Sequence, residues 1–310
     1  MGKILTISVA AYKTADTIGR TLDSLVNSDV LDDLEIIIVN DGSPDDTPQV
    51  AAKYAVRYPN SVKLIDKENG GWGSTVNASL EAATGKYYKI LDSDDYFETA
   101  NLKPFIEYLK GCSTDIVFTD FDYVYPGSVK HVTYPYQPKK AYITHNIRKI
   151  LMHGIAVRTE VIQGKLKLME HCYYTDNEFS VKAMQLSENF SYLPIKIYNY
   201  VMGNSSQSVS KAGYVRNAYD HEKLLDVIMP IVRHDPKFKL ANENHYQYLP
   251  GDQLYIFMLD KKFKNDFYRY YQKAKLTYPD LVKKMKIYIK FACKSPIFYR
   301  IFSSIIASKR

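Results

Sequence analysis

Strand-like and helix-like segments alternate along the first third of this 310-residue chain. Continuous apolar or β-rich runs predict strands at residues 4–10, 35–39, 62–65, 87–91 and 115–119. Apolar residues at helical spacing predict helices at residues 14–28, from Thr47 onward with Thr47 as cap, and at 74–84, closed by Gly85. Such alternation is typical of parallel strands joined by crossover helices. The sequence therefore predicts an α/β fold with an open, mainly parallel sheet flanked by helices.

Polar segments follow the first four predicted strands. In an open α/β sheet, ligands bind beyond the carboxyl ends of the strands, so these segments should meet at one edge. The four segments are Ala11-Tyr12, Asn40-Asp41-Gly42-Ser43, Glu68-Asn69-Gly70-Gly71 and Asp92-Ser93-Asp94-Asp95. Turn chemistry alone hardly explains four polar strand ends at one edge, so the pattern indicates a ligand site.

Three carboxylates gather after the fourth strand, at Asp92, Asp94 and Asp95. They repel one another and are costly to bury unless a positive charge lies among them, which a divalent cation supplies. A surface Asx turn could use the same residues. No GxGxxG follows the first strand and no GxxxxGK[ST] occurs, which argues against hydride transfer and P-loop chemistry. With Asp41 available to a base or ribose, the pattern suits a nucleotide diphosphate bridged by a metal ion.

Six sequence blocks resemble the family 2 glycosyltransferases of GT-A fold, in the family's order and spacing. These blocks are Ile7-Ser8-Val9-Ala10-Ala11-Tyr12, Ile36-Ile37-Ile38-Val39-Asn40-Asp41-Gly42-Ser43, Glu68-Asn69-Gly70-Gly71, Asn77-Ala78, Ala83-Thr84-Gly85-Lys86-Tyr87 and Leu91-Asp92-Ser93-Asp94-Asp95. The resemblance implies transfer of a sugar from a nucleotide-linked donor, usually UDP-linked, with inversion at the anomeric carbon. It also implies a role in bacterial cell-surface polysaccharide synthesis.

The resemblance also assigns roles to residues. Ala11 and Tyr12 would line the base pocket, and Asp41 would accept a hydrogen bond from uracil. Asp92, Asp94 and Asp95 would hold Mn²⁺ or Mg²⁺. The remaining residues expected to contact the nucleotide-sugar are Gly70, Gly71, Asn77 and Ser93.

Two positions depart from the family pattern. Asn40 stands where the family often has Asp, and Val76 stands where it often has Arg. The first change keeps the acid that matters, Asp41. The second leaves an arginine contact to the donor missing or supplied elsewhere.

The resemblance places the general base for inversion at Asp176, with Glu178 as the alternative. The block Tyr173-Tyr174-Thr175-Asp176-Asn177-Glu178-Phe179 resembles a family element, although Thr175 replaces the usual Glu. A structural interpretation is also open, in which Thr175 caps a helix over residues 176–184 and the acids favour its dipole.

Two further segments carry weaker signals. His153 could contact the metal or the acceptor, or could be an ordinary packed histidine. Tyr198-Asn199-Tyr200 and the later Gln207-Ser208-Val209-Ser210 resemble an element that folds over the diphosphate. The same residues would also be consistent with a strand followed by a polar loop.

The basic charge of the chain is concentrated at its end. Residues 261–310 carry 14 Lys and Arg against two acids, a net charge of +12, while the other 260 residues carry 27 against 32, or −5. A helix over 281–294 would gather Leu281, Val282, Met285, Tyr288, Ile289 and Ala292 on one face and Lys283, Lys286, Lys290 and Lys294 on the other. Such a helix is typical of anionic membrane surfaces. Packing against the protein body and a dimer contact are alternatives, and no nucleic-acid module is recognisable.

The domain organisation we expect has three parts: a nucleotide-sugar-binding half at residues 1–125, an acceptor-side half at 126–216, and a helical, basic region at 217–310. Three separated cysteines and no signal-peptide pattern predict a cytoplasmic protein, peripheral on the inner membrane face if its tail binds lipid. The predicted acceptor is a glycan or a lipid-linked glycan. The alternatives are a nucleotidylyltransferase, which expects a Gly-rich, Arg-containing loop that is absent here, and a non-catalytic sugar-binding relative.

Overall fold

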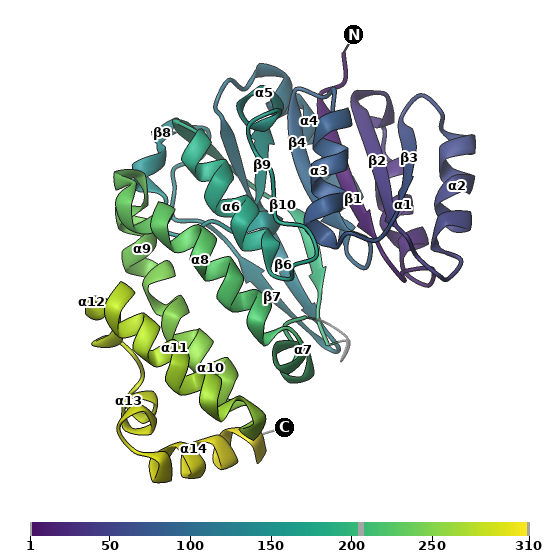
Figure 1. Cartoon of the computed structure of the whole chain (residues 1–310). Helices are drawn as coiled ribbons and strands as arrows, with labels where there is room; N and C mark the ends of the chain where they lie inside the picture. Colours follow the sequence, from purple (N-terminus) through teal and green to yellow (C-terminus); the bar gives the residue numbers. More distant parts are fainter. Residues whose placement is uncertain (1, 204–207, 309–310) are drawn as a thin grey trace. The chain divides into compact units, whose positions relative to one another are not determined.

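The computed structural model describes residues 2–203 and 208–308, and the chain divides into two compact units (Figure 1). The first, called here the α/β unit, comprises Met1–Asn146 and Ile150–Gly203. The second, the helical unit, comprises Ile147–Lys149 and Asn204–Arg310.

Four parallel strands open the α/β unit, in the spatial order β3-β2-β1-β4. They are β1 (Leu5–Ala11), β2 (Leu34–Asp41), β3 (Val62–Lys67) and β4 (Tyr87–Asp92). The helices between them are α1 (Ile18–Val26), α2 (Thr47–Arg57) and α3 (Trp72–Ala82). Every residue of β1 and β2 is buried, because helices cover both faces of the sheet. The predicted α/β alternation is confirmed.

The second half of the sheet is mixed rather than parallel. Beyond β4 the strand order continues β9-β6-β10-β5, with β7 paired to β6 and β8 to β10. Their bounds are β5 (Tyr96–Phe97), β6 (Ile116–Tyr125), β7 (Ser128–Val132), β8 (Tyr142–Ile143), β9 (Ile155–Arg158) and β10 (Asn189–Val201). Only β6 and β10 pair in parallel among these described strands. The predicted strand at 115–119 is therefore real, but it continues to Tyr125.

Helices lie on both faces of this sheet. On one face α1, α2 and α4 (Thr99–Gly111) share an apolar core with β1 and β2. On the other face Ser8 of β1 hydrogen-bonds Ser79 of α3 (2.7 Å), and α3 packs beside α6 (Thr175–Leu186). Figure 1 shows α3, α6 and the short α5 (Thr159–Ile162) in front of the strands. The described part of this unit also contains three 3₁₀ turns: η1 (Leu31–Asp33), η2 (Thr144–Asn146) and η3 (Met152–Gly154).

Some predicted helix ends were wrong. α1 is shorter than residues 14–28, and α2 has Asp46 rather than Thr47 as its cap residue. Gly85 does not cap α3, because the helix ends at Ala82 and Ala83 is already extended. Gly85 has another reason to be glycine: a Cβ there would lie 2.5 Å from the backbone nitrogen of Thr6. The residue allows the chain entering β4 to approach β1.

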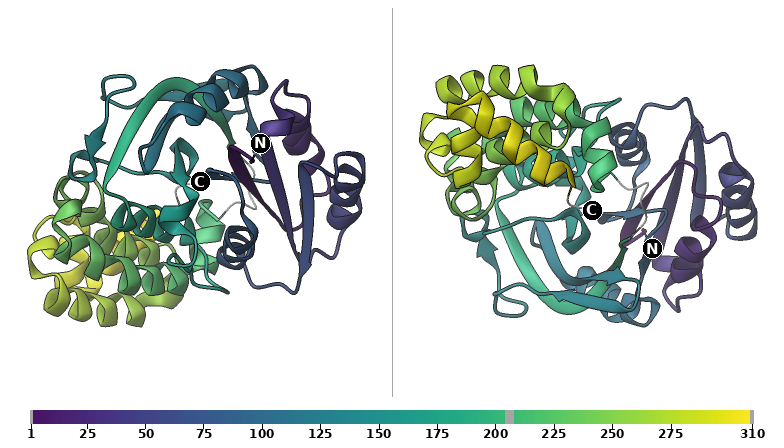
Figure 2. Two further views of the ribbon diagram at one scale, coloured as in Figure 1. Left: turned by 90° about the horizontal axis from the view of Figure 1, so that it is seen from above. Right: turned by 90° about the horizontal axis from the view of Figure 1, so that it is seen from below.

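The helical unit packs around apolar residues such as Leu225, Leu254, Phe257 and Phe267, all fully buried. Its helices are α7 (Lys211–Arg216), α8 (Ala218–His234), α9 (Lys239–Asn244), α10 (Leu249–Met258), α11 (Lys264–Thr277), α12 (Pro279–Val282), α13 (Ile287–Lys294) and α14 (Pro296–Ser308). Short 3₁₀ turns are η4 (Pro236–Phe238), η5 (Tyr246–Tyr248) and η6 (Lys261–Phe263). The predicted helical C-terminal region is confirmed, and Figure 2 shows α14 crossing the neighbouring helices.

The single helix predicted over residues 281–294 is interrupted. α12 ends at Val282, Lys286 is extended with ψ 143°, and α13 begins at Ile287. Among the described residues, no helix combines the length and apolarity needed to cross a bilayer.

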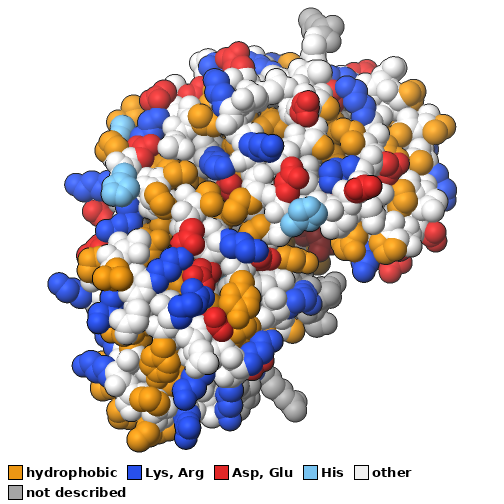
Figure 3. Space-filling view, in the orientation of Figure 1, with side chains coloured by type: hydrophobic (Ala, Val, Ile, Leu, Met, Phe, Trp, Pro, Cys, Tyr) orange, Lys and Arg blue, Asp and Glu red, His pale blue; other side chains and the backbone are white. Residues whose placement is uncertain are grey.

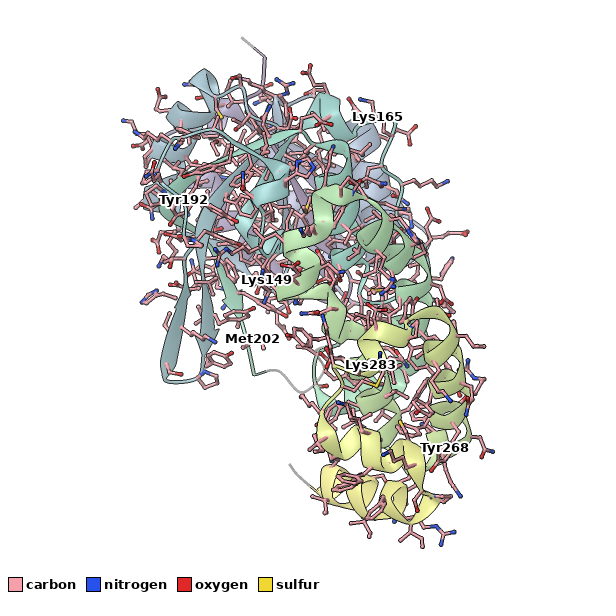
Figure 4. The ribbon with its side chains drawn as sticks, turned by 90° about the vertical axis from the view of Figure 1, so that its left-hand side faces the viewer. Lys149, Lys165, Tyr192, Met202, Tyr268 and Lys283 are labelled. Carbon is pink, nitrogen blue, oxygen red and sulfur yellow. The ribbon has the colours of Figure 1, made fainter. Side chains whose placement is uncertain are left out.

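Individual side chains tie neighbouring elements together within each unit. Tyr192 of β10 donates a hydrogen bond to Asp120 of β6 (2.7 Å), and Tyr268 of α11 donates to the carbonyl of Ala292 in α13 (3.2 Å); both tyrosines are labelled in Figure 4. Such contacts between distant segments fix strand and helix positions that local sequence patterns do not specify.

Candidate donor and metal site

The acidic segment lies at the carboxyl edge of the parallel strands, where it was predicted. β4 ends at Asp92, and Asp95 is fully buried three residues later. Asp95 Oδ1 accepts from the backbone N–H of Val201 (2.7 Å), and Oδ2 accepts from the Tyr198 hydroxyl (2.5 Å). The end of β10 therefore fixes this carboxylate in one orientation.

Trp72, the only tryptophan of the chain, orients Asp92. Its indole N–H donates to Asp92 Oδ1 over 2.7 Å from the first turn of α3. The sequence reasoning missed this residue, although a lone tryptophan directly after Gly70-Gly71 was a visible signal. Burial and the neighbouring Asp94 raise the pKa of the Asp92 carboxyl to about 7. A bound cation would reverse that effect by favouring the charged form.

Asp92, Asp95 and His153 form a candidate metal site. One potential ligand atom from each of them lies within 4.8 Å of the others. His153 Nδ1 is buried with no hydrogen-bond partner, and burial, together with the positive Lys89, lowers the pKa of the imidazole to about 3. The ring is therefore neutral, with a nitrogen lone pair available. Two carboxylates and a neutral imidazole fit a divalent cation.

Asp94 does not belong to this group of three. Its backbone carbonyl accepts from Arg20 of α1 (2.5 Å), and burial raises the pKa of its carboxyl. Asp94 was predicted as a metal ligand together with Asp92 and Asp95, and that role stays a prediction. His153, the weaker prediction, lies with the two other acids.

Lys89 holds the segment that carries His153. Its side chain is almost fully buried in β4, and its ammonium donates to the carbonyls of His153 (2.8 Å) and Ile155 (3.0 Å). The imidazole also stacks on Tyr200, with ring centroids 4.3 Å apart. A lysine inside an apolar strand gave no functional signal in the sequence, because its partners lie more than 60 residues away.

Asp41 joins the second and third strand ends. Its buried carboxylate accepts from the backbone N–H groups of Gly70 (2.9 Å) and Gly71 (2.8 Å) and pairs with Lys67 (2.9 Å). Gly71 has a φ of 82°, a conformation that favours glycine. These bonds shape the loop before α3, and the predicted contact of Asp41 with uracil stays a prediction.

The other predicted nucleotide-sugar residues differ in exposure. Tyr12 presents a 44% exposed ring, whereas Ala11 is buried. Ser93 is buried and its hydroxyl donates to Thr14 (2.9 Å). Asn77 bonds both the carbonyl and the N–H of Leu168, which ties α3 to the segment before α6. Of these, Tyr12 has the side chain most free to meet a ligand.

The two candidate bases, Asp176 and Glu178, have different surroundings in the structure. Asp176 lies in the first turn of α6, and its negative charge acts on Asp92, Tyr123 and Tyr200. Burial raises the pKa of its carboxyl to about 6. Glu178 is fully buried, pairs with Lys182 (2.6 Å) and accepts from the N–H of Met169 (3.0 Å). Asp176 therefore acts electrostatically on Asp92, and its role as the base stays a prediction, while Glu178 has structural partners.

Thr175 does not cap α6, contrary to the structural interpretation of the sequence. The helix begins at Thr175, the cap residue is Tyr174 with a φ of 67°, and Thr175 Oγ1 is buried without a hydrogen-bond partner. In the later segment, Ser210 caps α7 by accepting from Gly213 N–H (3.0 Å), while Gln207 lies outside the described residues.

The fold is of the GT-A glycosyltransferase type. Two solved structures share it: residues 1–349 of S. aureus TarS in complex with UDP-GlcNAc, and the mannosyltransferase PcManGT from Pyrobaculum calidifontis in complex with GDP-Man and Mn²⁺. TarS has a TM-score of 0.56 at 20% identity, covering 84% of this chain and 83% of its own. PcManGT has a TM-score of 0.57 at 16% identity, covering 99% and 87%. Identities this low establish the fold alone.

The chain belongs to glycosyl transferase family 2, whose family model matches residues 6–163, about half of its length. Among similar proteins, EpsH of Bacillus subtilis (strain 168) is 31% identical over 65% of this chain and 62% of its own length. Hyaluronan synthase of Pasteurella multocida is 31% identical over 68% of this chain but 22% of its own length. The match thus spans less than two thirds of either relative.

Proposed function

We propose that this protein transfers a sugar from a UDP-linked donor to a glycan or lipid-linked glycan, with inversion and with the help of a divalent cation. The observation that carries the proposal is the meeting of Asp92, Asp95 and His153 at the carboxyl edge of the sheet, where the charge of Asp176 also acts on Asp92. Membership of glycosyl transferase family 2 supports it. Residues 1–125 would bind the donor and residues 126–216 the acceptor.

In the proposed mechanism, Asp92, Asp95 and His153 would hold Mn²⁺ or Mg²⁺, with Asp94 as a further candidate ligand. When bound, the cation would neutralise charge on the departing diphosphate. The imidazole in the ligand set favours Mn²⁺ over Mg²⁺, which prefers oxygen ligands. Trp72 keeps Asp92 oriented, and Lys89 keeps His153 over the end of β4.

Asp176 would act as the general base. Its carboxylate would remove the proton of the acceptor hydroxyl as that oxygen bonds to the anomeric carbon and the bond from that carbon to the diphosphate breaks. A pKa near 6 suits this role, because the group is mostly ionised at neutral pH yet basic enough to accept a proton. Its place in the first turn of α6 fixes its position.

The donor and the setting rest on similarity. TarS was solved with UDP-GlcNAc and PcManGT with GDP-Man, so both a hexose and an N-acetylhexosamine are reasonable donors to test. The likeness to hyaluronan synthase supports a role in polysaccharide synthesis. We propose that the protein acts in the cytoplasm, peripherally at the inner face of the membrane when its acceptor is lipid-linked.

The direct test measures UDP released from a panel of UDP-hexoses and UDP-N-acetylhexosamines, with Mn²⁺, with Mg²⁺ and with EDTA. The proposal expects release with Mn²⁺, its loss with EDTA, and stimulation by a suitable saccharide. His153→Ala should abolish the Mn²⁺ response, whereas His145→Ala, at an exposed histidine of the same unit, should keep it. Nucleotide binding without release from any donor would instead indicate a non-catalytic relative.

A further inference from the structure

The helical unit exposes an apolar surface that differs from the face predicted for residues 281–294. Leu281, Met285, Ile289 and Ala292 are buried, packed against α10 and α14 within the unit. The exposed apolar residues are on another side of the same helices. They are Ile287 and Phe291 of α13 and Ile297, Phe298, Ile301 and Ile305 of α14, called here the α13–α14 face.

The α13–α14 face is continuous. Ile297, Ile301 and Ile305 are four residues apart and form one stripe along α14. The rings of Phe291 and Phe298 lie with centroids 5.5 Å apart and join this stripe to α13. Ile287 and Ile297 are 71% and 69% exposed, which is unusual for isoleucine on a surface without a function.

The charged side chains in the sequence of these last helices are all basic. Residues 281–310 contain eight Lys and Arg and no Asp or Glu. Lys283 (labelled in Figure 4), Lys286, Lys294 and Arg300 are exposed. Over the part of the surface where Figure 1 places α13 and α14, Figure 3 shows basic side chains beside hydrophobic ones.

We infer that the α13–α14 face docks on an anionic lipid bilayer. Apolar and aromatic side chains would enter the boundary between headgroups and acyl chains, and the surrounding lysines and Arg300 would contact lipid phosphates. Charge argues against a second copy of the chain as the occupant, since residues 281–310 carry only basic charges and two such faces would bring these like charges together. The inference does not depend on the proposed sugar transfer.

Co-sedimentation of the full chain with lipid vesicles tests it. The protein should bind vesicles of equal parts phosphatidylglycerol and phosphatidylcholine at low salt, lose binding as salt rises, and ignore pure phosphatidylcholine. The variant I287S/I297S removes the two most exposed isoleucines of the face and should weaken binding at least about tenfold. L276S, at an 86% exposed leucine of α11, is the matched control and should bind like the unchanged protein.

A second variant separates charge from apolar contact. K294E/R300E keeps the apolar residues but introduces two acids at exposed positions, and it should also lose binding. Absence of binding to anionic vesicles at low salt would overturn the inference, as would I287S/I297S binding at full strength. A dimer in light scattering that I287S/I297S dissolves, without vesicle binding, would assign the face to a second copy. Donor hydrolysis should be unchanged in every variant, so failure here is distinct from failure of the proposed function.

Discussion

The two units use charge in opposite ways. In the α/β unit, several ionised or ionisable groups are buried and held by partners in the protein, as with Asp41, Asp95 and Lys89. In the helical unit the excess charge is basic and exposed, and apolar side chains share the surface with it. Gathered buried carboxylates are costly unless a positive charge lies among them, so Asp92 and Asp95 indicate a cation as a ligand of the first unit. Exposed apolar area beside basic groups indicates a partner outside the second.

The largest effect is expected from the acidic site. Asp92→Asn keeps an oxygen for the indole of Trp72 but removes the charge, so transfer should fall at least about 10²–10³-fold, as when a charge-stabilising group is lost. The loss of transfer is measured as the rate of UDP release at increasing Mn²⁺ concentration. Asp120→Asn, at a half-buried acid of β6, is the control and should keep activity. Comparing Asp94→Asn with Asp95→Asn in Mn²⁺ affinity would show which acid is the ligand.

Asp176→Asn should lower kcat by roughly 10²–10⁴-fold, because an amide cannot accept the acceptor's proton. Binding of UDP should change little, as measured by calorimetry. Glu178→Gln is the matched variant: its partners Lys182 and Met169 are structural, so it should mainly lower the melting temperature. The reverse pattern, in which only the Glu178 variant loses kcat, would identify Glu178 as the base.

The pH profile of kcat should have an acidic limb near pH 6. The raised pKa of Asp176 means that the carboxyl becomes protonated, and inactive as a base, as pH falls through about 6. Below that point kcat should drop about tenfold per pH unit. Asp176→Asn should flatten this limb, and a limb that persists in the variant would assign it to another group.

The smallest effects are expected on the free energy of unfolding of each unit. Burial alone would raise the pKa of Glu35, but bonds from Lys63, Thr6 and Thr84 lower it. In the helical unit, burial alone would likewise raise the pKa of Glu222, but hydrogen bonds from Arg269 and Lys273 lower it. Each acid therefore stabilises its unit above its unfolded pKa, and this stability is lost as pH falls through the lower folded pKa.

Glu35→Ala and Glu222→Ala should each destabilise one unit by about 1–3 kcal/mol at neutral pH, with the loss shrinking in acid. Calorimetry should show two transitions, of which each variant lowers a different one. A single transition that shifts equally in both variants would mean that the units unfold together.

The sequence predicted the parts of the fold that depend on neighbouring residues. Apolar runs such as residues 36–39 specify buried strands. Because parallel strands bring their carboxyl ends to one edge of the sheet, the position of Asp92 and Asp95 at that edge could be predicted. Some helix ends were predicted wrongly, for example because Gly85 allows a close approach of two backbone segments and does not cap α3.

What the sequence could not supply were pairings between distant segments. Tyr198 meets Asp95 across 103 residues, and Lys89 meets His153 across 64. The mixed half of the sheet depends on such contacts as well. In the helical unit the helical projection grouped four residues that are buried, Leu281, Met285, Ile289 and Ala292, but it missed the break before Ile287 and could not tell that this face points inward.

Trp72 has a consequence for measurement. It is the only tryptophan in 310 residues, and its indole N–H is bonded to the carboxylate of Asp92. Indole emission depends on the charge and polarity beside the ring, and excitation at wavelengths that tyrosine does not absorb selects this one ring at the candidate site. Titration with a metal ion or a nucleotide should therefore change a signal that no other region contributes. The chain carries its own optical probe, placed by the fold against the first acid of the acidic segment.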